Sequence, residues 1–132
     1  MLISLDAIGS AAVHPVLAGS TYRLAGGFVG GYPPPGETRG LRFPDPDTLE
    51  WDPEHSAGIY NLYREEFSTL PDLAYGSCEQ SGVVGETLDD TELPASGDGF
   101  FYLVTAKNRL GEEGTKGRDS AGAWRPNPSA CP

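Results

Sequence analysis

Glycine and proline are so frequent in this chain that long helices are excluded. The sequence holds 18 glycines and 12 prolines among 132 residues. Glycine loses backbone entropy in a helix, and proline lacks the amide donor that a helix interior needs. Short strands joined by turns tolerate both residues, so the sequence predicts an all-β protein. Its length is that expected of one domain with a modest core.

Strand-like segments alternate with turns at a spacing typical of β-sandwiches and barrels. We expect strands at residues 41–43, 48–51, 59–64, 82–88, 99–106 and 116–123, and one helical turn within residues 65–73. The alternation in 59–64 places Tyr60, Leu62 and Arg64 on one face and Ile59, Asn61 and Tyr63 on the other. Residues 99–106 are apolar on both faces, so this strand is expected at the centre of its sheet.

Three of these segments resemble parts of a known kind of domain. Residues 49–51, 59–64 and 101–112 resemble strands B, C and F of a fibronectin type III-like domain. The resemblance implies a fibronectin type III/immunoglobulin-like β-sandwich over residues 37–132, and it says little about function. One position departs from the pattern, because Phe100 stands where the family usually has the tyrosine of its corner motif.

Two further segments resemble parts of exported bacterial multidomain and surface proteins. Residues 111–127, followed by Cys131 and Pro132, are similar to the closing segment of many such proteins. Residues 22–28 resemble a segment that precedes fibronectin type III-like domains there. The resemblance implies a bacterial protein that is exported.

Charge divides the chain near residue 36. Residues 1–36, which we name the arm, carry one acid and one base, whereas residues 37–132 carry the whole net charge of −10. The candidate self-association residues of the arm are apolar: Leu2, Ile3, Leu5, Ile8, Tyr22, Leu24, Phe28 and Val29. Exposed together they would form a larger apolar patch than soluble proteins normally carry. Either the arm adds strands to its own domain, or another chain covers its apolar face.

The acidic balance argues against two classes of partner. Nucleic acids and anionic membrane surfaces attract clustered basic residues, whereas this chain has 19 acidic and 9 basic residues. No apolar run reaches the ~18 residues that cross a bilayer. Residues 1–9 lack the basic start of a signal peptide, which leaves a cytoplasmic protein or a chain whose leader has been removed.

The two cysteines favour the second of these possibilities. Cys131 lies in a polar tail and is therefore a poor candidate for a buried thiol, although two buried free thiols remain the alternative. A disulfide between Cys131 and Cys78 would pin the tail and stabilise the fold by roughly 4 kcal/mol. Such a bond implies an oxidising compartment, so we expect an extracellular or cell-surface protein.

The histidines, cysteines and acidic residues do not match the common motifs of catalytic or metal-binding sites. The two histidines, His14 and His55, accompany no nucleophile motif, and the cysteines lack the spacing of a zinc site. Acidic groups within residues 45–52 and 89–92 fit calcium better than glycoside hydrolysis, but neither matches an EF-hand loop. A solvated acidic loop is the simpler interpretation. We expect no enzyme activity, no metal and no cofactor.

Aromatic residues offer one further kind of site, a platform on which sugar rings could stack. The candidates are Tyr60, Tyr63, Tyr75, Phe100, Phe101 and Tyr102. Their strand-like spacing favours the core instead.

Two functions follow from these features. In the first, the chain is a non-enzymatic extracellular structural subunit whose arm lends a strand to another copy, building a surface assembly that is filamentous if the exchange does not close. In the alternative, it is an adhesive, carbohydrate-contacting or spacer module of a larger secreted protein, with carbohydrate or other surface proteins as partners. The arm favours the first, because a spacer has no need of a long apolar segment before its first strand.

Overall fold

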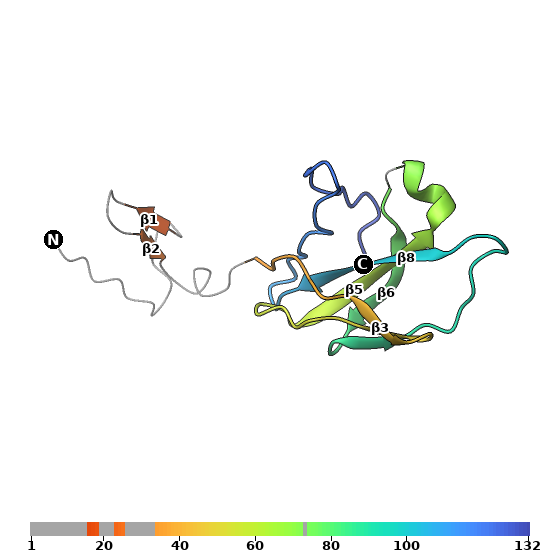
Figure 1. The fold of residues 1–132 in the computed structure, drawn as a ribbon. Coiled ribbons are helices and arrows are strands. Elements are labelled where there is room, and N and C mark those ends of the chain that lie inside the picture. The colour runs from red at the N-terminus through yellow and green to blue at the C-terminus, as the bar shows by residue number, and fades with distance from the viewer. Residues whose placement is uncertain (1–15, 19–22, 26–33, 73) are drawn as a thin grey trace. The chain divides into compact units, whose positions relative to one another are not determined.

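The chain divides into two compact units (Figure 1). The computed structural model describes residues 16–18, 23–25, 34–72 and 74–132. The first unit is Met1–Pro33, in which strand β1 (Val16–Ala18) pairs antiparallel with β2 (Arg23–Ala25). The second unit is Pro34–Pro132, which we name the two-sheet body. It begins slightly before the division that the charge distribution predicts.

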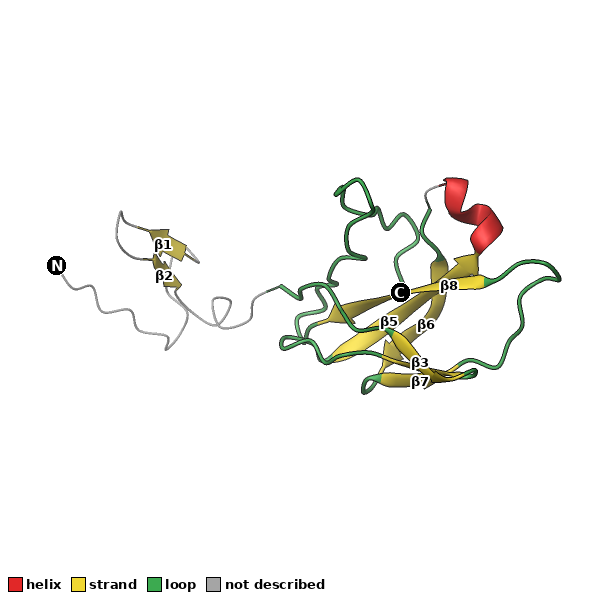
Figure 2. Cartoon of the chain, viewed as in Figure 1, coloured by secondary structure: helices red, strands yellow, loops and turns green. Residues whose placement is uncertain are grey.

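The two-sheet body consists of two three-stranded antiparallel sheets (Figure 2). One sheet has the order β3–β4–β7, with β3 at Arg42–Asp45, β4 at Thr48–Glu50 and β7 at Thr87–Asp89. The other has the order β6–β5–β8, with β6 at Ser77–Val83, β5 at Ile59–Glu66 and β8 at Phe100–Lys107. The one helix among the described residues is the 3-10 helix η2 (Phe67–Asp72), where a helical turn is predicted. The all-β prediction is confirmed.

Apolar side chains of both sheets meet in one core. Leu49 and Trp51 enter it from the end of β4, and Tyr60 and Leu62 enter it from β5. The rings of Trp51 and Tyr60 meet edge to face with their centroids 5.5 Å apart. Because side chains alternate along a strand, the period-two pattern of the sequence delivers these residues to one face.

The central strand of the second sheet is β5, so the prediction that residues 99–106 are central is wrong. β5 pairs with β6 on one side and with β8 on the other, and residues 60–63 are all buried. An apolar pattern reports that the faces of a strand are covered, and it carries no information on whether both edges are paired. The apolar character of β8 reflects covered faces at the edge of the sheet.

The strand predictions for residues 82–88 and 116–123 are also wrong. The expected strand at 82–88 is split between the sheets, because β6 ends at Val83 and β7 begins at Thr87. Gly85 turns the chain between them with a φ of 87°, a conformation that glycine adopts without strain. The expected strand at 116–123 is an irregular segment that contains one side of an isolated bridge, from Arg118 to Trp124.

Replacing the buried Leu62 with alanine should lower the free energy of unfolding by about 2–5 kcal/mol, because a cavity would remain between the sheets. Equilibrium urea denaturation measures this change. Leu93, which is 88% exposed, provides the matched control, and Leu93→Ala should change stability by less than about 0.5 kcal/mol. Equal losses in the two variants would contradict this placement of the core.

Candidate functional site

The structure joins the two predicted disulfide partners. Cys78 of β6 is bonded to Cys131, with their Cα atoms 5.1 Å apart and a sequence separation of 53. Of the arm residues expected to associate, Leu24 lies in β2. The other seven lie outside the described residues: Leu2, Ile3, Leu5, Ile8, Tyr22, Phe28 and Val29.

The C-terminal tail, residues 109–132, covers the face of the β6–β5–β8 sheet that points away from the core. Figure 1 shows this tail in blue beside that sheet. On the covered face, the carboxylate of Glu113 accepts hydrogen bonds from the Asn61 amide at 3.1 Å and from the hydroxyls of Tyr63 and Thr105, each at 2.5 Å. Those three donor residues are fully buried, so one tail carboxylate satisfies three polar side chains of the sheet.

Tyr63 holds the end of the tail as well. Its hydroxyl accepts hydrogen bonds from the Asn127 amide at 3.0 Å and from the backbone N–H of Cys131 at 2.9 Å. The ammonium of Lys116 lies 3.8 Å from the centre of the Tyr63 ring and donates to the carbonyls of Tyr75 and Gly76. Burial lowers the pKa of Lys116 to about 8, although the Glu113 carboxylate opposes the shift.

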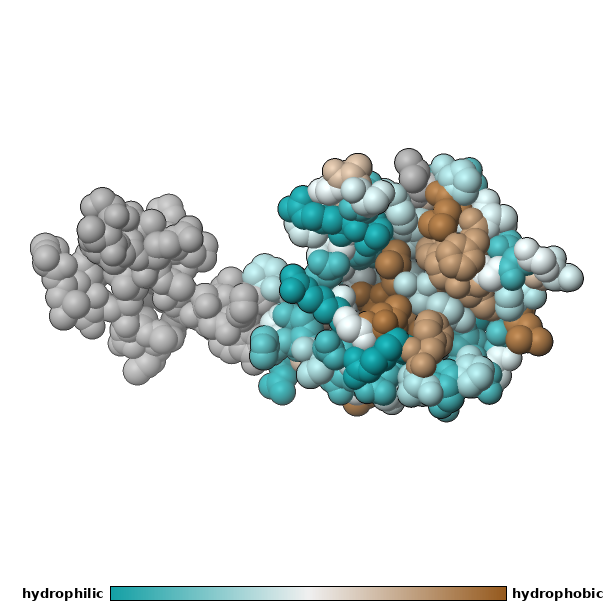
Figure 3. Space-filling view, in the orientation of Figure 1, coloured by the Kyte–Doolittle hydropathy of each residue, from teal (hydrophilic) through white to brown (hydrophobic). Residues whose placement is uncertain are grey.

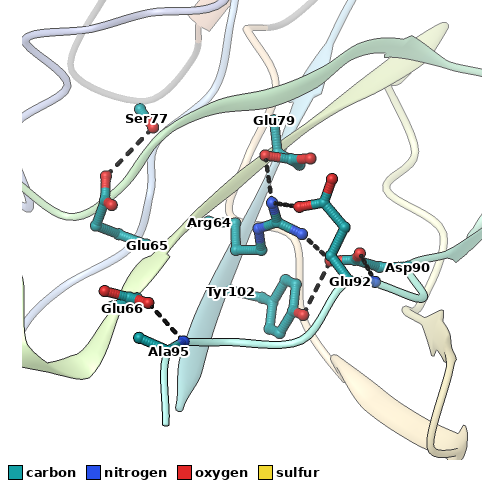
Figure 4. Close-up of polar contacts among 9 residues, drawn as sticks. All are labelled: Arg64, Glu65, Glu66, Ser77, Glu79, Asp90, Glu92, Ala95 and Tyr102. Carbon is teal, nitrogen blue, oxygen red and sulfur yellow. Dashed lines mark hydrogen bonds and ion pairs between the residues drawn. The ribbon is translucent and has the colours of Figure 1, made fainter. Parts of the chain in front are cut away.

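A charged cluster closes one end of the space between the sheets (Figure 4). Arg64, on the core-facing side of β5, pairs with Glu79 at 3.0 Å, with Asp90 at 2.6 Å and with Glu92. The Tyr102 hydroxyl donates to the same Asp90 carboxylate at 3.0 Å. The cluster joins β5, β6 and β8 to the segment that follows β7, and so ties the two sheets together.

The contacts within this cluster shift the pKa values of Asp90 and Tyr102 in opposite directions. Burial alone would raise the pKa of Asp90, but the Arg64 guanidinium and the bonds from Glu92 N–H and the Tyr102 hydroxyl hold it below its usual value. Burial and the neighbouring Asp90 carboxylate raise the pKa of Tyr102 to about 12. The cluster is therefore most stable with Asp90 ionised and Tyr102 protonated.

The side of the body between β3 and β8, which we name the open side, is closed less completely. The Phe43 ring of β3 is 51% exposed and lies 5.5 Å from the Tyr102 ring of β8. Leu41 and Tyr102 are half-buried and pack against the core from this side. Figure 3 shows apolar side chains gathered in a hollowed band between the two layers. The core thus reaches the surface here.

The other candidate sites are a surface depression, possible metal ligands and the aromatic residues of the sugar-stacking platform. A shallow depression of about 300 Å³ is lined by Glu37, Arg39, Asp52, Pro53, Glu54 and His55. Within the described part of the chain, no group of three or more His, Cys, Asp or Glu side chains is placed to hold a metal ion. Tyr60 and Tyr63 are buried on opposite faces of β5, which removes them from any sugar-stacking platform.

The sequence does not predict that the tail residues Glu113 and Asn127 are half-buried and that Lys116 is buried. Lysine and glutamate are almost never fully buried unless they are paired, so their types predict exposure. The one available signal is Cys131, because a disulfide to the body requires the intervening tail to lie against it.

No helix in the described residues is long and apolar enough to cross a membrane. No protein-family model, curated protein or solved structure matches the chain.

The lowered pKa of Lys116 predicts that the protein gains stability in mild alkali. Between about pH 8 and pH 10.5 the folded protein releases this proton while the unfolded chain retains it, so the free energy of unfolding rises with pH. Urea denaturation at about pH 7.5 and about pH 9.5 measures the rise. Lys116→Met should reduce it, whereas Lys107→Met should retain it, and an unchanged rise in Lys116→Met would contradict the assignment.

The lowered pKa of Asp90 predicts a dependence of the same sign in acid, where the free energy of unfolding falls as pH falls. Its contribution to stability is complete above the pKa of an unfolded aspartate, about 4, and is lost as pH falls through the lower pKa of the folded state. Asp90→Asn should therefore lose less stability than the parent protein between about pH 7 and about pH 3, as measured by thermal unfolding. Asp72→Asn, at an exposed position, should behave as the parent does; identical losses in all three proteins would refute the role of Asp90.

Proposed function

We propose that this chain is a non-enzymatic extracellular structural subunit that self-associates through its arm. The observation that carries the proposal is the open side of the two-sheet body, where apolar side chains of the core reach the surface. The same chain supplies an apolar segment with almost no charge, in residues 1–36. An added strand covers apolar side chains and pairs backbone groups in a single step.

The proposal includes a fibronectin type III/immunoglobulin-like fold for the two-sheet body. Its strand pairing supports this, since β4 pairs with β7 and β5 pairs with β8. In immunoglobulin-like sandwiches strands B and E share one sheet, and strands C and F share the other. With β4, β5 and β8 as strands B, C and F, the pairing agrees, and a last strand beside β8 is missing from the described residues.

The position that departs from the family pattern has a different role here. Phe100 stands where a corner tyrosine is expected, and its ring packs against the Arg64 guanidinium at 4.3 Å. The hydroxyl of Tyr102, two residues later, donates to Asp90 instead. A hydrogen bond between β8 and the preceding segment is thus supplied from a neighbouring position on the same face.

An extracellular location is supported by the cysteines. Both are used in the Cys78–Cys131 bond, which leaves no free thiol. A disulfide that pins a tail against the body persists in oxidising compartments and is reduced in most cytosols.

Light scattering of the full chain, compared with a chain that lacks residues 1–32, tests the proposed function. The full chain should form assemblies whose mass grows with concentration, because the arm of one copy reaches the next. The shortened chain should be a monomer that keeps its β-sheet circular dichroism and its disulfide. If the full chain is a monodisperse monomer and the deletion unfolds it, the arm belongs to its own core and the proposal is wrong.

A further inference from the structure

One half of strand β8 has an edge that pairs with no strand among the described residues, and we name it the free edge. Along its whole length β8 pairs with β5 on one side. On the other side it meets single bridges only, from Thr105 to Glu37 and from Lys107 to Glu113. No described strand pairs with that side at residues 100–103.

The backbone groups at this free edge point outward. Gly114 N–H donates to the carbonyl of Ala106 at 2.8 Å on the side away from β5. In an antiparallel ladder alternate residues direct both their N–H and C=O to the same side, so Tyr102 and Phe100 direct theirs outward with Ala106. These donors and acceptors form a template for one more strand.

A strand added at this edge would lie over the open side. Phe43 and Tyr102 are the aromatic residues there, with rings 5.5 Å apart, and Leu41 is half-buried beside the core. Alternate side chains of an added strand would project toward this apolar band, seen in Figure 3, and the others would face solvent. The site therefore selects a strand that is apolar on one face and polar on the other.

The first residues of the arm have that pattern. Residues 1–8 form the longest run of the arm without glycine or proline. In a strand, Ile3, Leu5 and Ala7 share one face, whereas Ser4 and Asp6 lie on the other. Residues 3–7 in extended form span about 13–17 Å, which is long enough to cover the edge from Phe100 to Leu103.

Charge favours the arm over any surface of a second body. Residues 37–132 carry the whole net charge of −10, so two bodies repel each other, whereas the arm has no net charge. An arm strand, with Asp6 as its one charged side chain, therefore meets much less repulsion from the acidic body than a second body does.

The direction of the chain favours the arm of another copy. Glu37 lies antiparallel to Thr105, so the preceding Pro35 and Pro34 run toward the Lys107 end of β8, away from Phe100. Pro35 and Gly36 approach Gly114 so closely that a Cβ there would lie 2.8 Å from the Gly36 carbonyl oxygen. Consecutive prolines, Pro34 and Pro35, stiffen the chain at this end of β8, which is opposite to the Phe100 end.

We propose that residues 3–7 of one copy add as a strand to the free edge of β8, at residues 100–103, of a second copy. This inference rests on the proposed function and specifies the donor and the acceptor. Because donor and acceptor are different surfaces, each copy can receive one strand and give another, and the contact is head-to-tail.

Matched pairs of substitutions in the full chain test both surfaces. Ile3→Asp with Leu5→Asp should raise the concentration needed for half-assembly at least about tenfold, whereas Ser4→Asp with Ser10→Asp, which adds the same charge at polar positions of the arm, should leave it nearly unchanged. Phe43→Asp should act as the first pair does. Phe67→Asp, which replaces a ring of similar exposure on η2, should not.

Amide hydrogen exchange on the unmodified chain provides a second measurement that needs no substitution. On assembly, exchange at the Phe100 and Tyr102 amides should slow by at least about tenfold, because the added strand accepts their hydrogen bonds. Assembly without slower exchange at either amide would overturn the acceptor assignment while leaving self-association intact. Equal effects of Phe43→Asp and Phe67→Asp, with both variants folded by circular dichroism, would do the same. Absence of any assembly would instead refute the proposed function.

Discussion

The hydrogen bonds of the Tyr63 hydroxyl join the C-terminal tail to the β6–β5–β8 sheet, on the face that points away from the core. β5 is buried on both faces, so the face that carries Tyr63 and Asn61 needs a cover as much as the core-facing side does. The tail supplies it, and Glu113 satisfies the buried polar side chains beneath. An unpaired buried polar group costs about 1–3 kcal/mol, so the polar sheet face and the polar tail depend on each other.

The sides of the core are closed by different chemistry. At one end Arg64 and its carboxylate partners join the two sheets through charge, and this arrangement is specific in geometry. On the open side, Phe43 and Tyr102 close the core only in part. A charged end disfavours an apolar partner and an apolar side accepts one, so the association that we propose would use the open side.

The sequence predicts the all-β class, the faces of β5 and the cysteine pair, because alternation and turn residues act locally. The position of β8 at a sheet edge could not be predicted, because the sequence of an apolar strand has the same pattern whether its edge is paired or free. Most of β6 could not be predicted as a strand, because its side chains are largely polar and exposed at the opposite edge of the sheet. The partners of Arg64 come from segments far along the chain, and local patterns carry no information on them.

The placement of the disulfide has a mechanical consequence. A force that pulls on the body at Pro34 and at Cys131 is transmitted through the covalent bond to Cys78 in β6. The segment between the two cysteines, which includes β8 and most of the tail, cannot lengthen under load. Only residues 34–78 can be drawn out, to a total length of about 150 Å as an extended chain. β8 and its free edge thus lie in the part of the body that resists extension.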